Sequence, residues 1–360
     1  MTRLIVGEPA PWFIGPTSSR PDYSFGSVAG RFIVLAFVSS SRSDPGQKLL
    51  AAISGNRRLF DDDRCAFFGV TADPADQAQA HVKDDPPGVR WFYDAGASIA
   101  GQYGVSDPQN GVSPSWLLLD PSLRLMATGG LDAPEAMIEL VRGLPPPEAH
   151  AGCELVAPVL VAPRIFEPGL CRALVDYYHW RGGEPSGFMI QQDGKTVIAA
   201  NPVHKRRSDC LVEDEQLRAD CRIRIQRRLT PEVAKAFQFQ ATRMERYIVA
   251  CYSAEEGGHF APHRDNTTKG TAHRRFAVTL NLNAEEYDGG ELRFPEFGGR
   301  TYKPPTGGAV VFSFSLLHEA LPVTRGARFA FLPFLYDEAA AELRERNNPH
   351  VDPALGEYRR

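Results

Sequence analysis

The stretch YSAEEGGHFAPHRD, residues 252–265, constrains the fold of this chain most strongly. It ends in His263-Arg264-Asp265, and residues i and i+2 of an extended strand project from the same face. The His263 imidazole and the Asp265 carboxylate can therefore converge on one point, which is half of a metal site. The third ligand must come from a distant strand. His318 is the candidate, because it follows a strongly apolar run typical of a buried strand.

Two neutral imidazoles and one carboxylate on one face of a divalent ion leave three adjacent coordination positions open, the arrangement that non-haem Fe(II) oxygenases use. The order His-x-Asp, a long gap and then His fits this arrangement. An isolated His-x-Asp is weak evidence, since a surface histidine near an aspartate is the ordinary explanation. A triad that is ornamental or binds another metal is therefore the alternative.

Arg328 stands ten residues after His318, behind a glycine turn at Gly326. If His318 and Arg328 lie on neighbouring antiparallel strands, the guanidinium can face the metal. An arginine there suits the far carboxylate of a dicarboxylic cosubstrate, because its planar fork donates two parallel hydrogen bonds and stays charged when buried. Tyr252 can add a phenol hydrogen bond to the same carboxylate.

Residues from about 155 to 337 resemble the Fe(II)/2-oxoglutarate dioxygenases of the prolyl 4-hydroxylase type. Three segments carry the resemblance in the family's order: ACY…GG.F..H.DN, LNLN…GGELRFPE and H…PV..G.RFA. The resemblance implies a double-stranded β-helix, or jelly roll, with supporting helices. It also implies iron ligands His263, Asp265 and His318, 2-oxoglutarate held by Arg328 and Tyr252, and a cosubstrate pocket lined by Asn281.

The reaction that this resemblance implies is hydroxylation of a C–H bond in a prolyl, peptidyl or other small substrate, with O2 consumed and succinate and CO2 released. The resemblance also implies ascorbate as a further ligand. Asp265 argues against halogenation, because halogenation in this superfamily needs the carboxylate position vacated for halide. Fold resemblance does not choose among the substrates.

The first 145 residues or so alternate strand-like and helix-like segments. This order predicts an α/β domain with a largely parallel central sheet and an edge hairpin. It resembles the thioredoxin-like fold in its peroxiredoxin version, through the GEPAPWF opening, the GVTADP segment and the WLLLDP hairpin. Pro114, before the hairpin strand, is a candidate cis proline whose isomer the sequence leaves open.

A peroxiredoxin carries its reactive cysteine at the strand-to-helix turn, which is SSSRSDPG here, residues 39–46, without a cysteine. Serine cannot replace a low-pKa thiolate that cycles through a sulfenic acid, and Cys65 is expected to be a packed core residue. We therefore expect a domain without peroxidase activity that serves interaction, homodimerisation or substrate recruitment. An oxygen- or redox-responsive regulatory protein that recruits a partner through this domain is the alternative function, and a thiol peroxidase is the least favoured.

The expected domain limits are 1–145 for the thioredoxin-like domain, 146–154 for a proline-rich linker, 155–340 for the dioxygenase domain and 341–360 for a C-terminal tail. Proline-rich composition makes such a linker short and stiff.

The polar stretch 181–209 predicts a long loop or loose hairpin over the open mouth of the jelly roll. Arg206 and Arg207 are candidates for substrate contact there, with a solvated surface pair as the alternative. His259 is expected at a polar rim, and His273 in an exposed polar loop.

Charge and cysteine usage exclude several classes of partner. The net charge of -4 and the pI near 6.2 argue against a general nucleic-acid binder. A run of about 18 apolar residues, as a membrane span needs, does not occur. The six cysteines are widely spaced without a C-x-x-C pair, which favours free thiols in a reducing compartment. We therefore expect a cytoplasmic protein whose partners are O2, a small-molecule or peptidyl substrate and, through the first domain, a protein.

Overall fold

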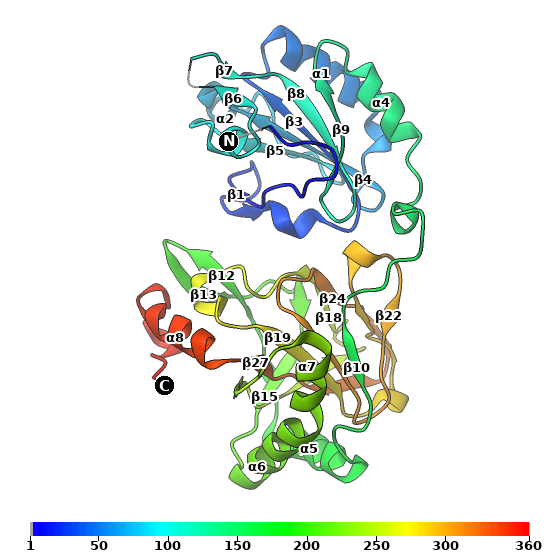
Figure 1. The fold of residues 1–360 in the computed structure, drawn as a ribbon, viewed down its shortest axis with the longest axis vertical. Coiled ribbons are helices and arrows are strands. Elements are labelled where there is room, and N and C mark those ends of the chain that lie inside the picture. The colour runs from blue at the N-terminus through cyan, green and yellow to red at the C-terminus, as the bar shows by residue number, and fades with distance from the viewer. Residues whose placement is uncertain (1–2, 108, 360) are drawn as a thin grey trace. The chain divides into compact units, whose positions relative to one another are not determined.

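The computed structural model describes residues 3–107 and 109–359 (Figure 1). The chain divides into two compact units. The N-terminal unit is Met1–Val156 with Pro295–Gly299, and the C-terminal unit is Ala157–Phe294 with Arg300–Arg360. Among the described helices, none combines the length and the apolar character that crossing a membrane requires.

The N-terminal unit is built on a five-stranded sheet with the order β5-β4-β3-β8-β9. Its strands are β3 (Phe32–Val38), β4 (Cys65–Thr71), β5 (Val89–Tyr93), β8 (Ser115–Leu119) and β9 (Leu125–Gly130). The first three pair in parallel, while β8 and β9 form an antiparallel hairpin beside β3. The expected α/β architecture with a parallel centre and an edge hairpin is therefore confirmed.

Two helices, α1 (Asp44–Gly55) and α4 (Glu135–Arg142), pack on one face of this sheet (Figure 1). Helix α1 begins where the Ser43 Oγ accepts a hydrogen bond from the Gly46 N–H at 3.2 Å, which satisfies one of the free donors of the first turn. Shorter helices are α2 (Pro74–Ala78) and α3 (Ser98–Gln102). Within the described residues the cis peptide bond is Pro86-Pro87, so the bond before Pro114 is trans.

The C-terminal unit contains two antiparallel sheets that face each other. The larger sheet has the order β10-β23-β19-β26-β17-β15-β11, with β16 and β27 paired at its side. Its strands are β10 (Leu160–Ala162), β11 (Glu184–Pro185), β15 (Ser208–Leu211), β16 (Arg243–Glu245), β17 (Ile248–Ser253), β19 (Phe276–Asn281), β23 (Ala309–Ser313), β26 (Ala327–Phe331) and β27 (Phe334–Tyr336).

The smaller sheet has the order β14-β18-β24-β21-β22. Its strands are β14 (Lys205–Arg206), β18 (His259–His263), β21 (Leu292–Arg293), β22 (Thr301–Tyr302) and β24 (His318–Ala320). Two further strand pairs lie outside these sheets: β12 (Phe188–Gln192) forms a hairpin with β13 (Lys195–Ala199), and β20 (Asp288–Gly289) pairs with β25 (Val323–Arg325). The expected loop or loose hairpin at 181–209 thus includes a regular hairpin, β12–β13.

Alternation along the strands sorts the side chains between two cores. Val249, Leu280 and Phe331 face helices α5 (Pro168–Arg181), α6 (Glu215–Arg224) and α7 (Thr230–Phe237). A π-helical turn, Ile225–Leu229, joins α6 to α7. On the opposite face, Ala250 and Ala330 pack with Phe260 and Ala320 of the smaller sheet. The second core therefore fills the space between the two sheets, as expected of a jelly roll braced by helices.

The chain ends in helix α8 (Glu338–Arg346) and two short 3-10 turns, and a buried carboxylate connects α8 to the sheet. Glu245 on β16 accepts hydrogen bonds or ion pairs from His273 Nε2 at 3.2 Å, Arg274 Nε at 2.7 Å and Arg344 Nη1 at 2.7 Å. His273 is buried, so the expected exposed loop position is wrong: a carboxylate out of water needs donors around it, and His273 is one of them.

We expect Glu245→Gln to lower the free energy of unfolding by about 2 kcal/mol near neutral pH. Burial alone would raise the pKa of Glu245, but Arg274, His273 and Arg344 hold the pKa of that carboxyl well below its usual range. A carboxyl with a depressed folded-state pKa stabilises above its unfolded-state pKa, and this contribution fades as pH falls. The difference between variant and wild type, measured by urea unfolding, should therefore shrink below about pH 4. Glu232→Gln, at an exposed pair with Lys235, is the control that should change little.

Candidate metal centre

The two histidines of the sequence motif lie directly opposite each other on neighbouring strands of the smaller sheet. His263 on β18 pairs in register with His318 on β24, and Asp265 follows two residues after His263. One ligand atom of each of the three side chains lies within 4.8 Å of the other two. Asp265 Oδ1 is 3.6 Å from His263 Nε2, and Asp265 Oδ2 is 3.5 Å from His318 Nε2. The structure thus brings the three predicted ligands together at one point.

Each imidazole is oriented by its own strand. His263 Nδ1 lies 2.8 Å from the Ala261 carbonyl oxygen, and His318 Nδ1 lies 3.0 Å from the Leu316 carbonyl oxygen. A carbonyl only accepts, so both Nδ1 atoms carry the proton and both Nε2 lone pairs are left for a ligand. Burial, and after it the neighbouring His318, lowers the pKa of His263 well below its usual value, which keeps this ring neutral. Two neutral imidazoles and a carboxylate fit a divalent first-row metal.

Arg328 lies on β26 of the larger sheet, opposite Tyr252 on β17, and is almost completely buried. Its Cζ atom is 5.0 Å from the centre of the Tyr252 ring. Within the described chain its Nε and Nη1 atoms have no hydrogen-bond partner, nor does the buried hydroxyl of Tyr287. Burial raises the pKa of Tyr287, and the charge of Arg328 opposes that rise, so the two side chains lie close together. Buried donors without acceptors are costly, and a carboxylate between them would satisfy them.

The expectation that His318 and Arg328 lie on neighbouring antiparallel strands is wrong. Strand β24 pairs with β18 and β21, whereas β26 pairs with β17 and β19, so the two residues lie in different sheets. Between them the chain crosses from one sheet to the other through β25 and turns at Gly326, which has φ 73°. A Cβ at that position would come within 2.7 Å of the Glu286 carbonyl oxygen, so the turn needs glycine.

Tyr252 and Asn281 both lie on the larger sheet and face the smaller one. The Tyr252 hydroxyl accepts a hydrogen bond from Arg207 Nη1 at 3.3 Å, which leaves its own proton free to donate. Asn281 is in register with Ala330, two residues from Arg328. Its Nδ2 donates to the Pro304 carbonyl at 2.7 Å, and its Oδ1 is buried without a partner among the described residues.

Two buried cations, Lys205 and Arg207, lie beside this centre, and only Arg207 was a candidate for substrate contact in the sequence. Of the pair Arg206 and Arg207, the first is exposed as the solvated alternative expects, but Arg207 is buried and donates to Asp209 Oδ2 at 2.7 Å. Lys205 is 7% exposed and was missed. Strand alternation could not have found it, because Lys205 lies on β14 of the smaller sheet and Asp209 on β15 of the larger one. His259, expected at a polar rim, is half-buried and bonds to the backbone oxygens of Gly257 and Val203.

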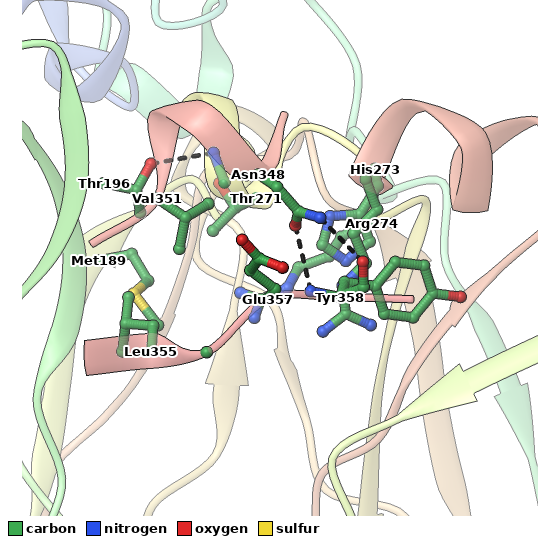
Figure 2. Close-up of a pocket in the computed structure, with 13 residues that line it drawn as sticks. Met189, Thr196, Thr271, His273, Arg274, Asn348, Val351, Leu355, Glu357 and Tyr358 are labelled. Atoms are coloured by element: carbon green, nitrogen blue, oxygen red, sulfur yellow. Dashed lines mark hydrogen bonds between the residues drawn. The ribbon is translucent and has the colours of Figure 1, made fainter. Parts of the chain in front are cut away.

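A pocket elsewhere in the C-terminal unit contains none of the three clustered ligands. Figure 2 shows the side chains that line it, which come from the β12–β13 hairpin, the segment around His273 and the chain after α8. The C-terminal residues pair with that hairpin through an isolated parallel β-bridge between Val351 and Thr196. The hydrogen bonds of Asn348 with Tyr358 fold this end of the chain back on itself.

In the N-terminal unit, the turn before α1 is fixed by a fully buried carboxylate. Asp76 accepts hydrogen bonds from the Ser41 hydroxyl at 2.6 Å, the Ser41 N–H at 2.8 Å and the Thr71 hydroxyl. His81 Nδ1 lies 3.2 Å from the same carboxylate. The turn at residues 39–46 therefore contains no thiol, and its Ser41 is hydrogen-bonded to the Asp76 carboxylate.

We expect the purified protein to consume hydrogen peroxide no faster than its Cys65→Ser variant. Cys65 is buried in the core of the sheet, and burial raises the pKa of its thiol to about 12, so the reactive thiolate is scarce at neutral pH. A peroxide-consumption assay with an excess of dithiol reductant measures this. Turnover that disappears in the variant would revive the peroxidase hypothesis.

Comparison with known families and proteins agrees with this geometry. Residues 247–336 match the 2OG-Fe(II) oxygenase superfamily, and residues 6–127 match the AhpC/TSA family. A PKHD-type hydroxylase of Cupriavidus metallidurans (strain ATCC 43123 / DSM 2839 / NBRC 102507 / CH34) is 39% identical over 95 residues, 24% of this chain and 42% of that protein. A PKHD-type hydroxylase of Synechococcus sp. (strain JA-2-3B'a(2-13)) is 37% identical over 89 residues, 23% of this chain and 39% of that protein. The chain thus spans about two fifths of the length of these relatives.

Two solved structures are similar to separate parts of the chain. A prolyl-4-hydroxylase from Pseudomonas putida has a TM-score of 0.40 at 19% identity, covering 51% of this chain and 94% of that one. Peroxidoxin BcpB from Mycobacterium tuberculosis has a TM-score of 0.34 at 17% identity, covering 40% of this chain and 99% of that one.

Proposed function

Because residues 247–336 form a 2OG-Fe(II) oxygenase domain and residues 6–127 an AhpC/TSA-family domain, we propose that the chain is an Fe(II)- and 2-oxoglutarate-dependent dioxygenase that hydroxylates a C–H bond. One observation carries the proposal: the ligand atoms of His263, Asp265 and His318 converge, with both Nε2 lone pairs available. The unpartnered N–H groups of buried Arg328 support a dicarboxylic cosubstrate at the same site.

The roles of the residues follow from their donors and acceptors. His263, Asp265 and His318 hold Fe(II), and Arg328 pairs with the distal carboxylate of 2-oxoglutarate. Tyr252 donates its free proton to that carboxylate while it accepts from Arg207, and Asn281 lines the same space. Bound Fe(II) and 2-oxoglutarate supply the activation of O2 that C–H hydroxylation requires, with succinate and CO2 as co-products. The apolar side chains between the sheets exclude water from this chemistry.

The substrate and the role of the N-terminal unit are parts of the same proposal. The substrate in this proposal is prolyl, peptidyl or another small molecule, and the relatives named PKHD-type hydroxylase agree with hydroxylation as the reaction. We assign residues 1–145 a recruiting or dimerising role, since the turn at residues 39–46 contains no cysteine. A cytoplasmic location agrees with the six free cysteines.

The test is an anaerobic titration of the metal-free protein with Fe(II) and then 2-oxoglutarate, followed through the visible charge-transfer band of the chelate. Glutarate, which lacks the keto group, is the matched control and should give no band. Succinate formed on admission of air should depend on both additions. A wild-type protein that neither retains iron nor develops the band would refute the proposal.

A further inference from the structure

The space between the sheets holds a second group of cations besides Arg328. We call Lys205, Arg207 and Arg246 the cationic cluster; the carboxylate within it is Asp209. Arg207 Nη2 lies 2.7 Å and Arg246 Nη2 lies 3.5 Å from Asp209 Oδ2. Two guanidinium groups thus share one carboxylate, so the cluster carries excess positive charge even before Lys205 is counted.

Lys205 is the member that has no acidic partner at bonding distance among the described residues. Its Nζ donates to Ser186 Oγ at 2.8 Å and to the Gly187 carbonyl at 2.5 Å, both neutral oxygens. Burial, and after it the charge of Arg207, lowers the pKa of Lys205 to about 6, so the amine without an anion is largely neutral at pH 7. A bound carboxylate would restore the charge, and the ammonium would then have a third N–H to donate to it. A buried amine that lacks an anion is energetically unfavourable, which indicates that the position is kept for something other than stability.

The cluster lies next to the metal centre. Lys205 on β14 is in register with Phe260 on β18, and its Nζ is 4.8 Å from the centre of the Phe260 ring. That ring stacks on the His263 imidazole with 3.5 Å between centroids. Asp265 is among the charges that act on the Lys205 amine, and Lys205 is among those that act on His263. One aromatic ring therefore links the amine to a metal ligand.

The two carboxylates of 2-oxoglutarate leave this charge unmatched. A divalent ion with Asp265 keeps one positive charge, which the keto-acid end matches, and Arg328 matches the distal end. Neither carboxylate of 2-oxoglutarate is then left to neutralise the positive charge of the cluster that Asp209 does not match. Resting on the proposed function, we propose that Lys205 determines specificity by binding a carboxylate of the primary substrate, which is a small carboxylic acid rather than an internal peptide segment. Because only the Phe260 ring separates the Lys205 amine from the metal ligand His263, the carboxylate bound by Lys205 lies close to the carbon that is oxidised.

The test uses acetate as the probe and acetamide as its neutral isostere. Each is titrated calorimetrically, at constant ionic strength, into the anaerobic Fe(II)–2-oxoglutarate complex of the full chain, with the charge-transfer band recorded in the same sample. We expect the wild type to bind acetate and not acetamide. Lys205→Met should weaken acetate binding about tenfold or more, Lys205→Arg should retain it, and Arg206→Met, at the exposed neighbouring cation, should leave it unchanged.

Thermal melting of the ligand-free protein supplies a second readout. Lys205→Met should raise Tm, because it removes a buried amine without an anion. An acetate affinity that is the same in Lys205→Met and wild type, or no acetate binding by the wild type, would overturn the proposal. A missing charge-transfer band counts against the dioxygenase instead, since selective loss of acetate binding in Lys205→Met can be measured without turnover.

Discussion

Asp265→Ala is expected to abolish iron retention and to lower 2-oxoglutarate turnover by about 1000-fold or more, because it removes the one anionic ligand of the site. The two imidazoles keep their orientation, since each is held by a backbone carbonyl of its own strand and not by Asp265. The variant should therefore lose iron and turnover without a change in fold.

Iron content after desalting and succinate formation in air measure this effect, with circular dichroism as the check on folding. Asp288→Ala is a matched control, because Asp288 is an exposed carboxylate paired with Arg325 in the same unit. A variant at Asp265 that still carries stoichiometric iron and turns over like the wild type would show that the triad is not the metal site.

Arg328→Met is expected to weaken 2-oxoglutarate binding about 100-fold, the usual consequence of removing one partner from a buried charge pair. Binding of 2-oxobutyrate, which lacks the distal carboxylate, should change little. The variant should therefore lose the preference between the two keto acids, and Arg328→Lys should restore part of it, since lysine keeps the charge but not the fork.

The titration of the charge-transfer band gives both affinities. Arg325→Met is the control: it stands three residues earlier in the chain, but its guanidinium is exposed and pairs with Asp288. If Arg328→Met left the preference for 2-oxoglutarate intact, another residue would have to bind the distal carboxylate, and the cationic cluster would be the first candidate.

Local rules predicted the metal centre well, because its main determinant is local. His263 and Asp265 share a face through strand alternation, and the apolar run before His318 marks the strand β23 that precedes it. Long-range pairing was not predictable in the same way. Arg328 was expected beside His318, yet β26 joins the other sheet, and no feature of the turn at Gly326 reveals which sheet a strand enters.

The burial of polar residues could not be predicted from the sequence either. The sequence around His273 is polar, and its burial depends on Glu245, 28 positions earlier. Lys205 looks like a surface cation until β14 is known to pair with β18, the strand that carries His263. The N-terminal unit was easier, because its core strands are continuous apolar runs whose order alone indicates a parallel sheet.

The buried carboxylate of Asp76 makes position 41 unsuitable for a reactive thiol. A thiol introduced by Ser41→Cys would face the acid that now accepts the Ser41 hydroxyl proton. Two negative charges at that separation repel, so the thiolate would be disfavoured and the new cysteine would stay protonated. A reactive thiol at position 41 would therefore require the replacement of Asp76 as well.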